Sequence, residues 1–529
     1  MKRNAWQSIA WPMWPLLLPL LPSFRSPSGA LVVGVCWLAV MLLPNRRAAT
    51  ADMLDAGLLA LSAWVVLGIS WSAHGSTTLS AAWQIGPGAL AFFATRQVRP
   101  ERTERILSAL ALGGGLLAFG ALLELAGRNL HLLPPPAHWQ ALGRAHWPLT
   151  NPDHLAYLME GVVPFAFLLF LRRPSAGRLA ILLVLLSTLA ATLSASAPLA
   201  LLGAVVLAFV RGQDDRSRPR VRAIIATTLL AIAAMMPYWW LGARGALTAG
   251  DPAGERLLIW KAGWQAWLDR PCTGFGFGCF DRAMAPHQNW LERVDYTHAH
   301  NILLEWLTTT GIVGALLGCL CLAAWWRRRT RDTWPARAAV AGCVVMLLHE
   351  GFDFGLLETA GSCWFGFLTG LAVARKPIPP ATTLSSELSK RRVWASRWPA
   401  NLAAAALVML AALAGLVCRI TSPNPANDDS IAQDPRNPAP ILQAATLARL
   451  AGKAGEAERL ARLALARQPG LTQTRLLLAA ALQRQGRNEA AREWIRPLIP
   501  FYDSLPVAEK QEAADEIDCL ASLVHTSGN

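Results

Sequence analysis

The chain has 529 residues, of which 53% are hydrophobic and only 16% are charged. A composition this apolar excludes an ordinary soluble globular protein and favours an integral membrane protein. The formal net charge of +15 would suit a protein that binds nucleic acid. Most Lys and Arg, however, fall in short connectors between apolar runs, so the positive excess indicates membrane topology and argues against nucleic acid as a partner.

Apolar runs recur through residues 1–421 and predict an all-α, polytopic transmembrane bundle of about 12–13 spans. The runs lie near 6–24, 30–43, 53–71, 79–95, 106–126, 154–171, 178–195, 198–210, 223–241, 302–325, 336–349, 355–374 and 400–418. Several of them are shorter than the usual 20 or so residues. Arginine clusters mark alternate connectors, which predicts a cytoplasmic N-terminus. The same alternation places residues 127–153, residues 242–301 and everything after Arg419 outside. The first run lacks a small-x-small cleavage site, so we expect a retained span.

The composition changes after residue 421. A linker rich in Pro, Asn and Asp (residues 422–437) precedes a segment rich in Ala, Leu and Arg (residues 438–529). Small residues recur in that segment every 34 positions, which resembles tetratricopeptide repeats: Ala445, Gly452 and Ala457 return as Ala479, Gly486 and Ala491. The alternative is an ordinary helical hairpin. Repeats of this kind form a scaffold with a groove, so a partner protein is possible.

The stretch THAHNILLEWLTTTGIVG (residues 297–314) opens with His298, His300 and Asn301 and then becomes apolar except for Glu305. The apolar run ends at an arginine cluster, which predicts a membrane helix whose far end is cytoplasmic. The two imidazoles and the amide would therefore lie at the outer mouth of that helix. Glu305 would be costly in lipid, so we expect it to face the bundle interior, in a structural role or paired with an arginine.

The outer loop, residues 242–301, is too long for a simple connection. Helical spacing of its aromatic residues from residue 256 onward predicts an amphipathic helix, with Arg256 and Lys261 near its start. The glycine run TGFGFG after that helix has no preceding strand and no following Lys-Ser/Thr, so it predicts a tight turn with close backbone approach, not a nucleotide loop. Cys272 and Cys279 flank this run, and outside the cytoplasm they could be reduced or bridged by a disulfide.

In combination these motifs resemble the O-antigen ligase and O-antigen polymerase superfamily of membrane glycosyltransferases. The family pattern of His-Asn, nine residues, Gly, two residues and a small residue is present as His300-Asn301, Gly311 and Gly314. Further matches are the R-x-x-x-W segment 256–260, the glycine run within 271–280, NPDHLA at 151–156 and HEGFD at 349–353. The resemblance covers roughly residues 30–375, and the repeat region lies outside it.

The resemblance implies transfer of a glycan from an undecaprenyl-pyrophosphate-linked donor to an acceptor hydroxyl at the periplasmic side of a bacterial inner membrane. The acceptor would be a lipid, a glycan or a protein. His300 would be the base or the group that orients the acceptor, with capping of the helix mouth as its structural alternative. Arg256 would be the pyrophosphate-binding cation, with anchoring of its helix at the membrane interface as its structural alternative. The supporting polar and substrate-binding residues would be His298, Asn301, Lys261, Arg244 and Asp353. No cofactor is needed, and a metal site built from the 349–353 segment and the two histidines is the less favoured alternative.

One position departs from the family pattern. The family has Ser-Arg-Gly near the outer end of a span before the large loop, where this chain has Ser196-Ala197-Pro198. Either another cation substitutes, with Arg244 and Arg282 available, or activity is altered or lost. Two alternatives therefore stay open: a catalytically inactive scaffold for envelope polysaccharide assembly, and a polytopic transporter. The transporter alternative predicts two related halves, and the sequence shows no such internal symmetry.

Overall fold

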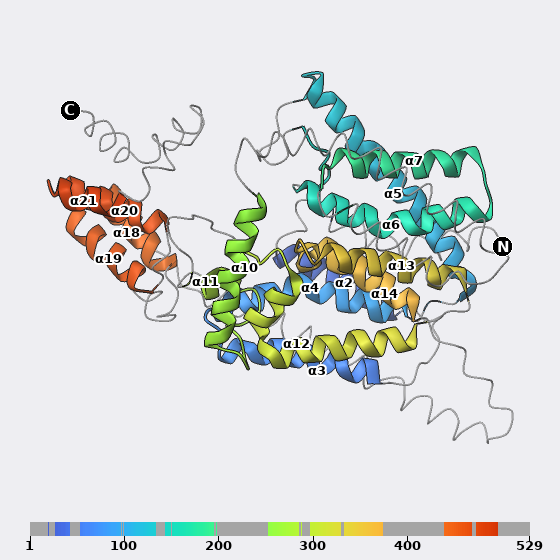
Figure 1. The fold of residues 1–529 in the computed structure, drawn as a ribbon, viewed down its shortest axis with the longest axis horizontal. Coiled ribbons are helices and arrows are strands. Elements are labelled where there is room, and N and C mark those ends of the chain that lie inside the picture. The colour runs from blue at the N-terminus through green and yellow to red at the C-terminus, as the bar shows by residue number, and fades with distance from the viewer. Residues whose placement is uncertain are drawn as a thin grey trace.

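The computed structural model describes residues 20, 27–42, 53–96, 98, 100–133, 143–149, 151–194, 197, 252–284, 287, 297–329, 333–373, 439–467 and 472–495. These segments are helical and connected by turns, with no β-strand among them, which confirms the all-α fold class (Figure 1). The expected spans 198–210, 223–241 and 400–418, nearly all of 6–24, Arg244 and the linker 422–437 lie outside the described residues.

Each apolar run within the described residues forms a helix. The helices are α2 (Pro27–Leu42), α3 (Met53–Leu67), α4 (Gly75–Thr95), α5 (Pro100–Asn129), α6 (Pro152–Arg172), α7 (Ala176–Ala191), α12 (Ile302–Arg328), α13 (Trp334–His349) and α14 (Thr359–Ala372). In the described part of the chain, four segments are long and apolar enough to cross a membrane: Met53–Ser70, Arg102–Asn129, Pro152–Arg172 and Ile302–Arg328. The architecture is that of a helical membrane protein.

The centre of the bundle is the contact between α4 and α14. A Cβ atom on Gly366 would lie 1.9 Å from the backbone oxygen of Gly88, so the two helices cross with their backbones almost touching. Small residues allow this approach, which is how helices gain van der Waals contact in a membrane. On the neighbouring side, α13 packs on α6, and α5 and α7 cover α6 in turn (Figure 1). These contacts bury the large side chains Trp37, Phe165 and Phe367.

The two ends of the bundle differ in chemistry. At one end, Arg96 pairs with Asp55, Arg173 lies 3.9 Å from Glu104, and the Arg172 guanidinium lies over the Trp334 ring. At the other end, connector 71–78, the start of α6, loop 350–358 and the start of α12 meet. The arginines gather at the first end, which agrees with the alternation of basic connectors in the sequence. Which end faces the cytoplasm stays a prediction.

Two helices of the outer loop lie at the second end, α10 (Pro252–Asp269) and α11 (Phe280–Met284) (Figure 1). They are attached there by a break in α12 at Gly311, whose φ of 66° and ψ of −177° are not helical. The break frees carbonyl groups that the loop then uses. Thr308 O accepts from the amide of Phe275 at 3.0 Å, and Thr309 O accepts from the amide of Gly276 at 2.9 Å.

The attachment, which we call the Gly311 latch (residues 271–276 against 308–312), is closed from both sides. The amide of Ile312 donates to Pro271 O at 2.8 Å, and Trp64 Nε1 of α3 donates to Thr310 O at 2.9 Å. A Cβ atom on Gly274 would lie 2.5 Å from the carbonyl carbon of Thr309. The prediction of a tight turn with close backbone approach for the glycine run is therefore confirmed.

The C-terminal segment forms two helical hairpins around a hydrophobic core of its own: α18 (Ala439–Leu450), α19 (Ala454–Arg467), α20 (Thr472–Arg484) and α21 (Asn488–Ile495). The turns repeat with the spacing seen in the sequence. The amide of Lys453 donates to Ala448 O at 2.9 Å, and the amide of Arg487 donates to Leu482 O at 3.0 Å. The structure thus shows two equivalent hairpins, whereas their membership of the tetratricopeptide family and their periplasmic location stay predictions.

The latch makes Gly311 a position where a side chain cannot be tolerated. In a Gly311→Ala variant the new Cβ would meet Cys272 O at 2.2 Å, and the backbone strain alone would cost about 1–3 kcal/mol. We expect a lower melting temperature in detergent and faster protease cleavage of residues 252–284. Gly318→Ala is the matched control on the same helix, because its Cβ would meet only Trp306 ring atoms at 3.8 Å. Equal stability of the two variants would contradict the role of the latch.

Candidate functional site

The start of α12 is tied to loop 350–358. Asn301 caps the helix, since its side-chain oxygen accepts from the amides of Leu303 and Leu304 at 3.1 Å. Its side-chain nitrogen donates to Gly351 O at 3.1 Å, and the amide of Ile302 donates to Glu350 O at 2.9 Å. Asn301 is therefore a structural clamp that sets where the two neighbouring histidines lie.

His300 faces an aspartate across this junction. Its Nδ1 lies 3.3 Å from Asp353 Oδ1, and its ring stands edge-on to Phe354 with 4.9 Å between ring centroids. The backbone of His300 has a φ of 48°, a left-handed conformation that costs a non-glycine residue about 1–3 kcal/mol. Such strain is concentrated at functional sites, where the surrounding structure enforces it. The orientation leaves Nε2 on the edge of the ring opposite Asp353.

Asp353 is almost fully buried and lies between two imidazoles. Its second oxygen, Oδ2, lies 3.3 Å from His349 Nε2. Burial by itself raises the pKa of the Asp353 carboxyl, but the imidazoles of His300 and His349 beside it outweigh burial and hold that pKa well below its usual value. Asp353 is therefore a carboxylate at neutral pH, and one of its two oxygens faces His300.

His298 contacts a different carboxylate. Its Nδ1 lies 3.3 Å from Glu305 Oε1, while Glu305 Oε2 accepts from the amide of Ala299 at 2.7 Å. Burial lowers the pKa of His298, but the charge of Glu305 and the hydrogen bond to it raise that pKa above its usual value. The His298 ring also stacks on Phe354 at 4.4 Å. Glu305 thus faces the interior as expected, and its partners are a histidine and a backbone amide.

The α10 helix lies against this histidine segment. Trp260 Nε1 donates to Ala299 O at 2.9 Å, directly between the two histidines. Arg256 precedes Trp260 by four residues, so it shares that face of α10 about 6 Å away. Arg256 is half-buried and has no ion-pair partner within the described residues. Lys261 is exposed and points about 100° round the helix from Trp260.

The structure therefore brings four predicted residues together: His298, His300, Asn301 and Asp353. Arg256 lies on α10, one helical turn before Trp260, which is bonded to the backbone between the two histidines. Lys261 is not part of this group, and Arg244 lies outside the described residues. Sequence reasoning missed Glu160, whose two carboxylate oxygens lie 3.0 Å from His349 Nδ1. The available signal was a carboxylate in the middle of an apolar span, which is a functional candidate by default.

Two further expectations concern thiols and metals. Cys272 and Cys279 are both free thiols, so the disulfide alternative is wrong. The reason is that the turn at residues 274–278 buries Cys279 under connector 71–78, where its Sγ lies 3.4 Å from Ser72 Oγ, while Cys272 stays exposed. Within the described residues, no group of three or more His, Cys, Asp and Glu side chains is arranged to hold a metal ion.

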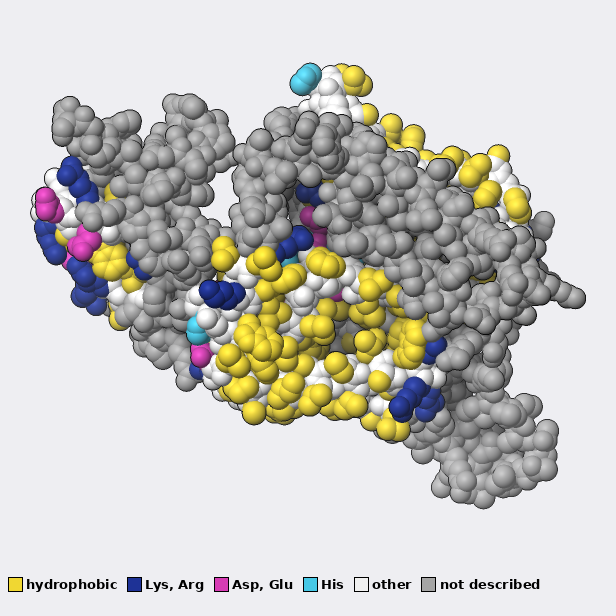
Figure 2. Space-filling model, viewed as in Figure 1, with side chains coloured by type: hydrophobic (Ala, Val, Ile, Leu, Met, Phe, Trp, Pro, Cys, Tyr) yellow, Lys and Arg dark blue, Asp and Glu magenta, His cyan; other side chains and the backbone are white. Residues whose placement is uncertain are grey.

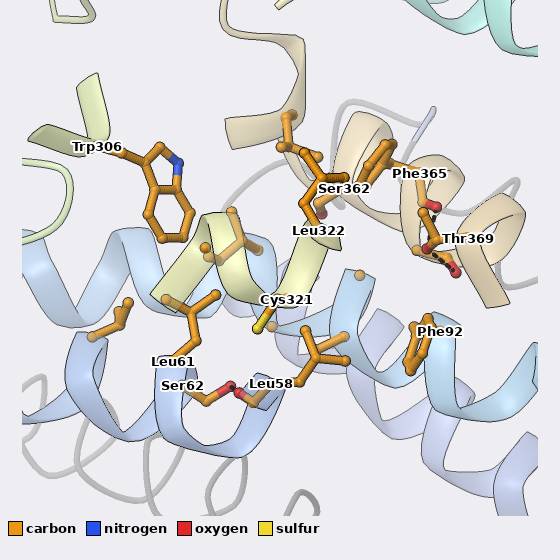
Figure 3. Close-up of a pocket in the computed structure, with 18 of the residues that line it drawn as sticks. Leu58, Leu61, Ser62, Phe92, Trp306, Cys321, Leu322, Ser362, Phe365 and Thr369 are labelled. Atoms are coloured by element: carbon orange, nitrogen blue, oxygen red, sulfur yellow. Dashed lines mark hydrogen bonds between the residues drawn. The ribbon is translucent and has the colours of Figure 1, made fainter. Parts of the chain in front are cut away.

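An apolar groove starts beside the histidines. Its cavity volume is about 390 Å³, and α3, α4, α12 and α14 form its walls (Figure 3). Ile302 and Trp306 line the end beside the histidines, and Trp325 and Thr369 line the far end. The α12 wall between residues 302 and 325 is about 35 Å long. The groove therefore extends through the bundle over roughly the thickness of a bilayer core.

The groove offers almost no polar groups to a ligand. The hydroxyl groups of Ser62, Ser362 and Thr369 each donate to a backbone carbonyl of their own helix. Leu303 and Leu322 line the groove and are also 66% and 43% exposed, so it opens sideways onto the molecular surface. Figure 2 shows that hydrophobic side chains cover much of this α3 and α12 face. The site thus combines a polar mouth with an apolar channel that opens onto the side of the bundle.

A search of curated proteins finds no match to this chain. A protein-family model does match: residues 180–319 fit the model described as O-antigen ligase. The matched range includes Arg256, His298, His300 and Gly311, and it ends before His349 and Asp353. Ala197, where the family arginine was expected, lies inside this range and is fully buried. The match supports a place for this chain in the O-antigen ligase superfamily.

Proposed function

We propose that this protein transfers a glycan from an undecaprenyl-pyrophosphate-linked donor to an acceptor hydroxyl on the periplasmic side of a bacterial inner membrane. The observation that carries the proposal is the position of His300 and Asp353 at the mouth of the apolar groove. A lipid-linked sugar has the same division, a long apolar chain that ends in a charged head. The groove would take the prenyl chain, and the polar mouth would take the diphosphate and the sugar.

Arg256 is the cation best placed for the diphosphate. It lies one turn from Trp260, which is bonded to the segment between the two histidines. An arginine stays charged at every physiological pH and can grip two phosphate oxygens at once. Its lack of an ion-pair partner within the described residues leaves its charge available to an anionic substrate.

In the reaction, Nε2 of His300 takes the proton of the acceptor hydroxyl, and Asp353 stabilises the resulting imidazolium through Nδ1–H. The hydroxyl oxygen forms a bond to the anomeric carbon as the bond from that carbon to the diphosphate oxygen breaks. The lipid diphosphate leaves with the bonding electron pair, and Arg256 neutralises its charge. General-base catalysis contributes about 10²–10⁴-fold, so charge stabilisation must supply much of the remainder.

The acceptor class decides whether the enzyme is a ligase, a polymerase or a protein glycosyltransferase. The two C-terminal hairpins form a folded unit with its own core, which favours an acceptor or partner that is a protein or an assembly complex. A catalytically inactive scaffold is the competing function, and the buried Ala197 is the observation that favours it. The two functions differ in whether the purified protein transfers glycan at all.

Separate His300→Gln and Arg256→Gln variants test the catalytic assignment. We expect transfer to fall about 10²–10⁴-fold for His300→Gln, because glutamine keeps a polar contact with Asp353 but cannot take a proton. For Arg256→Gln we expect a loss of about 10²–10³-fold. The assay uses protein in lipid nanodiscs and a fluorescent oligosaccharide on undecaprenyl pyrophosphate. Lipid A core, a second donor molecule and a protein serve as acceptors in separate reactions.

The matched controls for these variants are His287→Gln, in the outer loop, and Arg459→Gln, exposed on α19; both should keep wild-type transfer. Wild-type transfer by His300→Gln and Arg256→Gln would refute the assigned roles. If the unmodified protein transfers glycan to none of the three acceptors, the scaffold function is the better conclusion.

Cys319 gives a direct test of the groove, because it is an exposed thiol on the groove wall. In a chain whose other cysteines are alanine, undecaprenyl pyrophosphate should slow the reaction of Cys319 with a membrane-permeant maleimide severalfold. The matched chain keeps only Cys272, an exposed thiol of the outer loop that the groove does not include, and its labelling should not change. Unaltered labelling of Cys319 at saturating lipid would exclude the groove as the site of the prenyl chain.

A further inference from the structure

A buried chain of charged groups runs inward from His300, and the proposed reaction uses only its first link. Asp353 Oδ2 lies 3.3 Å from His349 Nε2, and His349 Nδ1 lies 3.0 Å from both carboxylate oxygens of Glu160. His349 and Glu160 are fully buried, and Asp353 is nearly so. Asp353 therefore has one imidazole at each oxygen: His300 at the mouth of the site and His349 in the bundle interior.

Hydrogen-bond chemistry links the charge of His349 to the charges of its two partners. A neutral imidazole carries one N–H and one lone pair, so only an imidazolium can donate to a carboxylate at each of its two nitrogens. Nδ1 of His349 lies equally far from the two oxygens of Glu160, a geometry that suits an N–H directed between them. With both acids ionised, the series is carboxylate, imidazolium, carboxylate, with one net negative charge.

We propose that Glu160 is a positioning residue that keeps His349 charged and thereby moderates the field of Asp353 at His300. The inference rests on the proposed role of His300 as the base. A base must be unprotonated when the reaction starts, whereas a buried carboxylate 3.3 Å away favours the protonated imidazole. The imidazolium on the far side of Asp353 offsets part of that carboxylate's charge.

The direction in which proton binding by His300 changes follows from the order in which Glu160, His349 and Asp353 are arranged. His349 lies between Glu160 and Asp353, so the positive charge is nearer to His300 than the negative charge of Glu160 is. Removing the Glu160 carboxylate leaves a buried cation with one partner fewer, so His349 gives up its second proton. His300 then loses the nearer positive charge and faces an unmoderated Asp353. It consequently holds its proton to a higher pH.

Other ionisable groups lie around this series of charged groups: Tyr157 and His154 on α6, Glu350 at the end of α13, Asp153 at the start of α6, and the His298–Glu305 pair. Burial raises the pKa of Glu350 well above its usual value, which favours the neutral acid. His298 and Glu305 contact each other at 3.3 Å, so their charges compensate locally. None of these groups substitutes for the carboxylate of Glu160.

The Glu160→Gln variant tests the proposal, because it keeps the shape of the side chain and removes only its charge. In nanodiscs, the acidic limb of kcat against pH should move to higher pH by about one unit. Glu160→Asp, which keeps the charge, should move the limb by less. Selective ¹⁵N-histidine NMR of the full chain should show a ring protonated at both nitrogens up to pH 8. That signal should be absent from Glu160→Gln and from His349→Gln, which assigns it.

Two results would overturn the proposal. One is a neutral His349 in the unmodified protein. The other is a Glu160→Gln variant whose rate falls equally at every pH, whose acidic limb does not move, and whose melting temperature is lower. That pattern indicates a purely structural link between α6 and α13. Failure of the proposed function is recognised separately, by wild-type transfer in His300→Gln. In that case the kinetic role fails, and the NMR signal still reports whether Glu160 sets the charge of His349.

Discussion

The arrangement of the bundle end that carries the histidines depends on the backbone hydrogen bonds made where α12 breaks at Gly311. An intact helix uses all of its interior carbonyl groups internally and has none to offer to a neighbour. Only the break makes carbonyls available, and the amides of Phe275 and Gly276 satisfy them. In a lipid environment an unpaired carbonyl would cost several kcal/mol, so the break and the loop depend on each other. This mutual dependence holds α10, with Trp260 and Arg256, over the start of α12.

The polar residues of the site lie where the helices end, and this placement decides which charges are tolerated. His298 and Glu305 contact each other at the start of α12, and Asp353 contacts two imidazoles in the adjoining loop. Each buried carboxylate thus has a nitrogen partner, which offsets the loss of solvation. The groove below has no comparable groups, because its hydroxyls are bonded to their own helices. The boundary between charged mouth and apolar channel is therefore sharp.

Local sequence patterns predicted the helices and the residues at the mouth. Apolar runs gave the spans but understated their length where a helix continues into polar residues: the run near 106–126 belongs to a helix that spans Pro100–Asn129. His300, Asn301 and Asp353 were identified because they belong to short motifs. The hydrogen bond from Asn301 to Gly351 could not be predicted from the sequence, because no local pattern says which loop a helix cap will bind.

Contacts between distant segments account for the rest. Glu160 and His349 are 189 residues apart, and neither position alone indicates that the two side chains are in contact. The groove has four helices as walls, so no single helix reveals it. The alternative of a Cys272–Cys279 disulfide was wrong because spacing along the chain says nothing about burial, and the turn between these residues carries Cys279 under connector 71–78.

The sideways opening of the groove has a consequence for turnover. Under the proposed function, a lipid-linked donor that enters between helices from the surrounding bilayer diffuses in two dimensions, and its prenyl chain stays in a hydrocarbon environment throughout. Exchange of spent carrier for fresh carrier would then require no movement of residues 271–276, which the Gly311 latch holds in place. Encounter frequency would depend on the surface density of the carrier lipid and on membrane viscosity, so temperature and lipid composition would influence the rate of transfer.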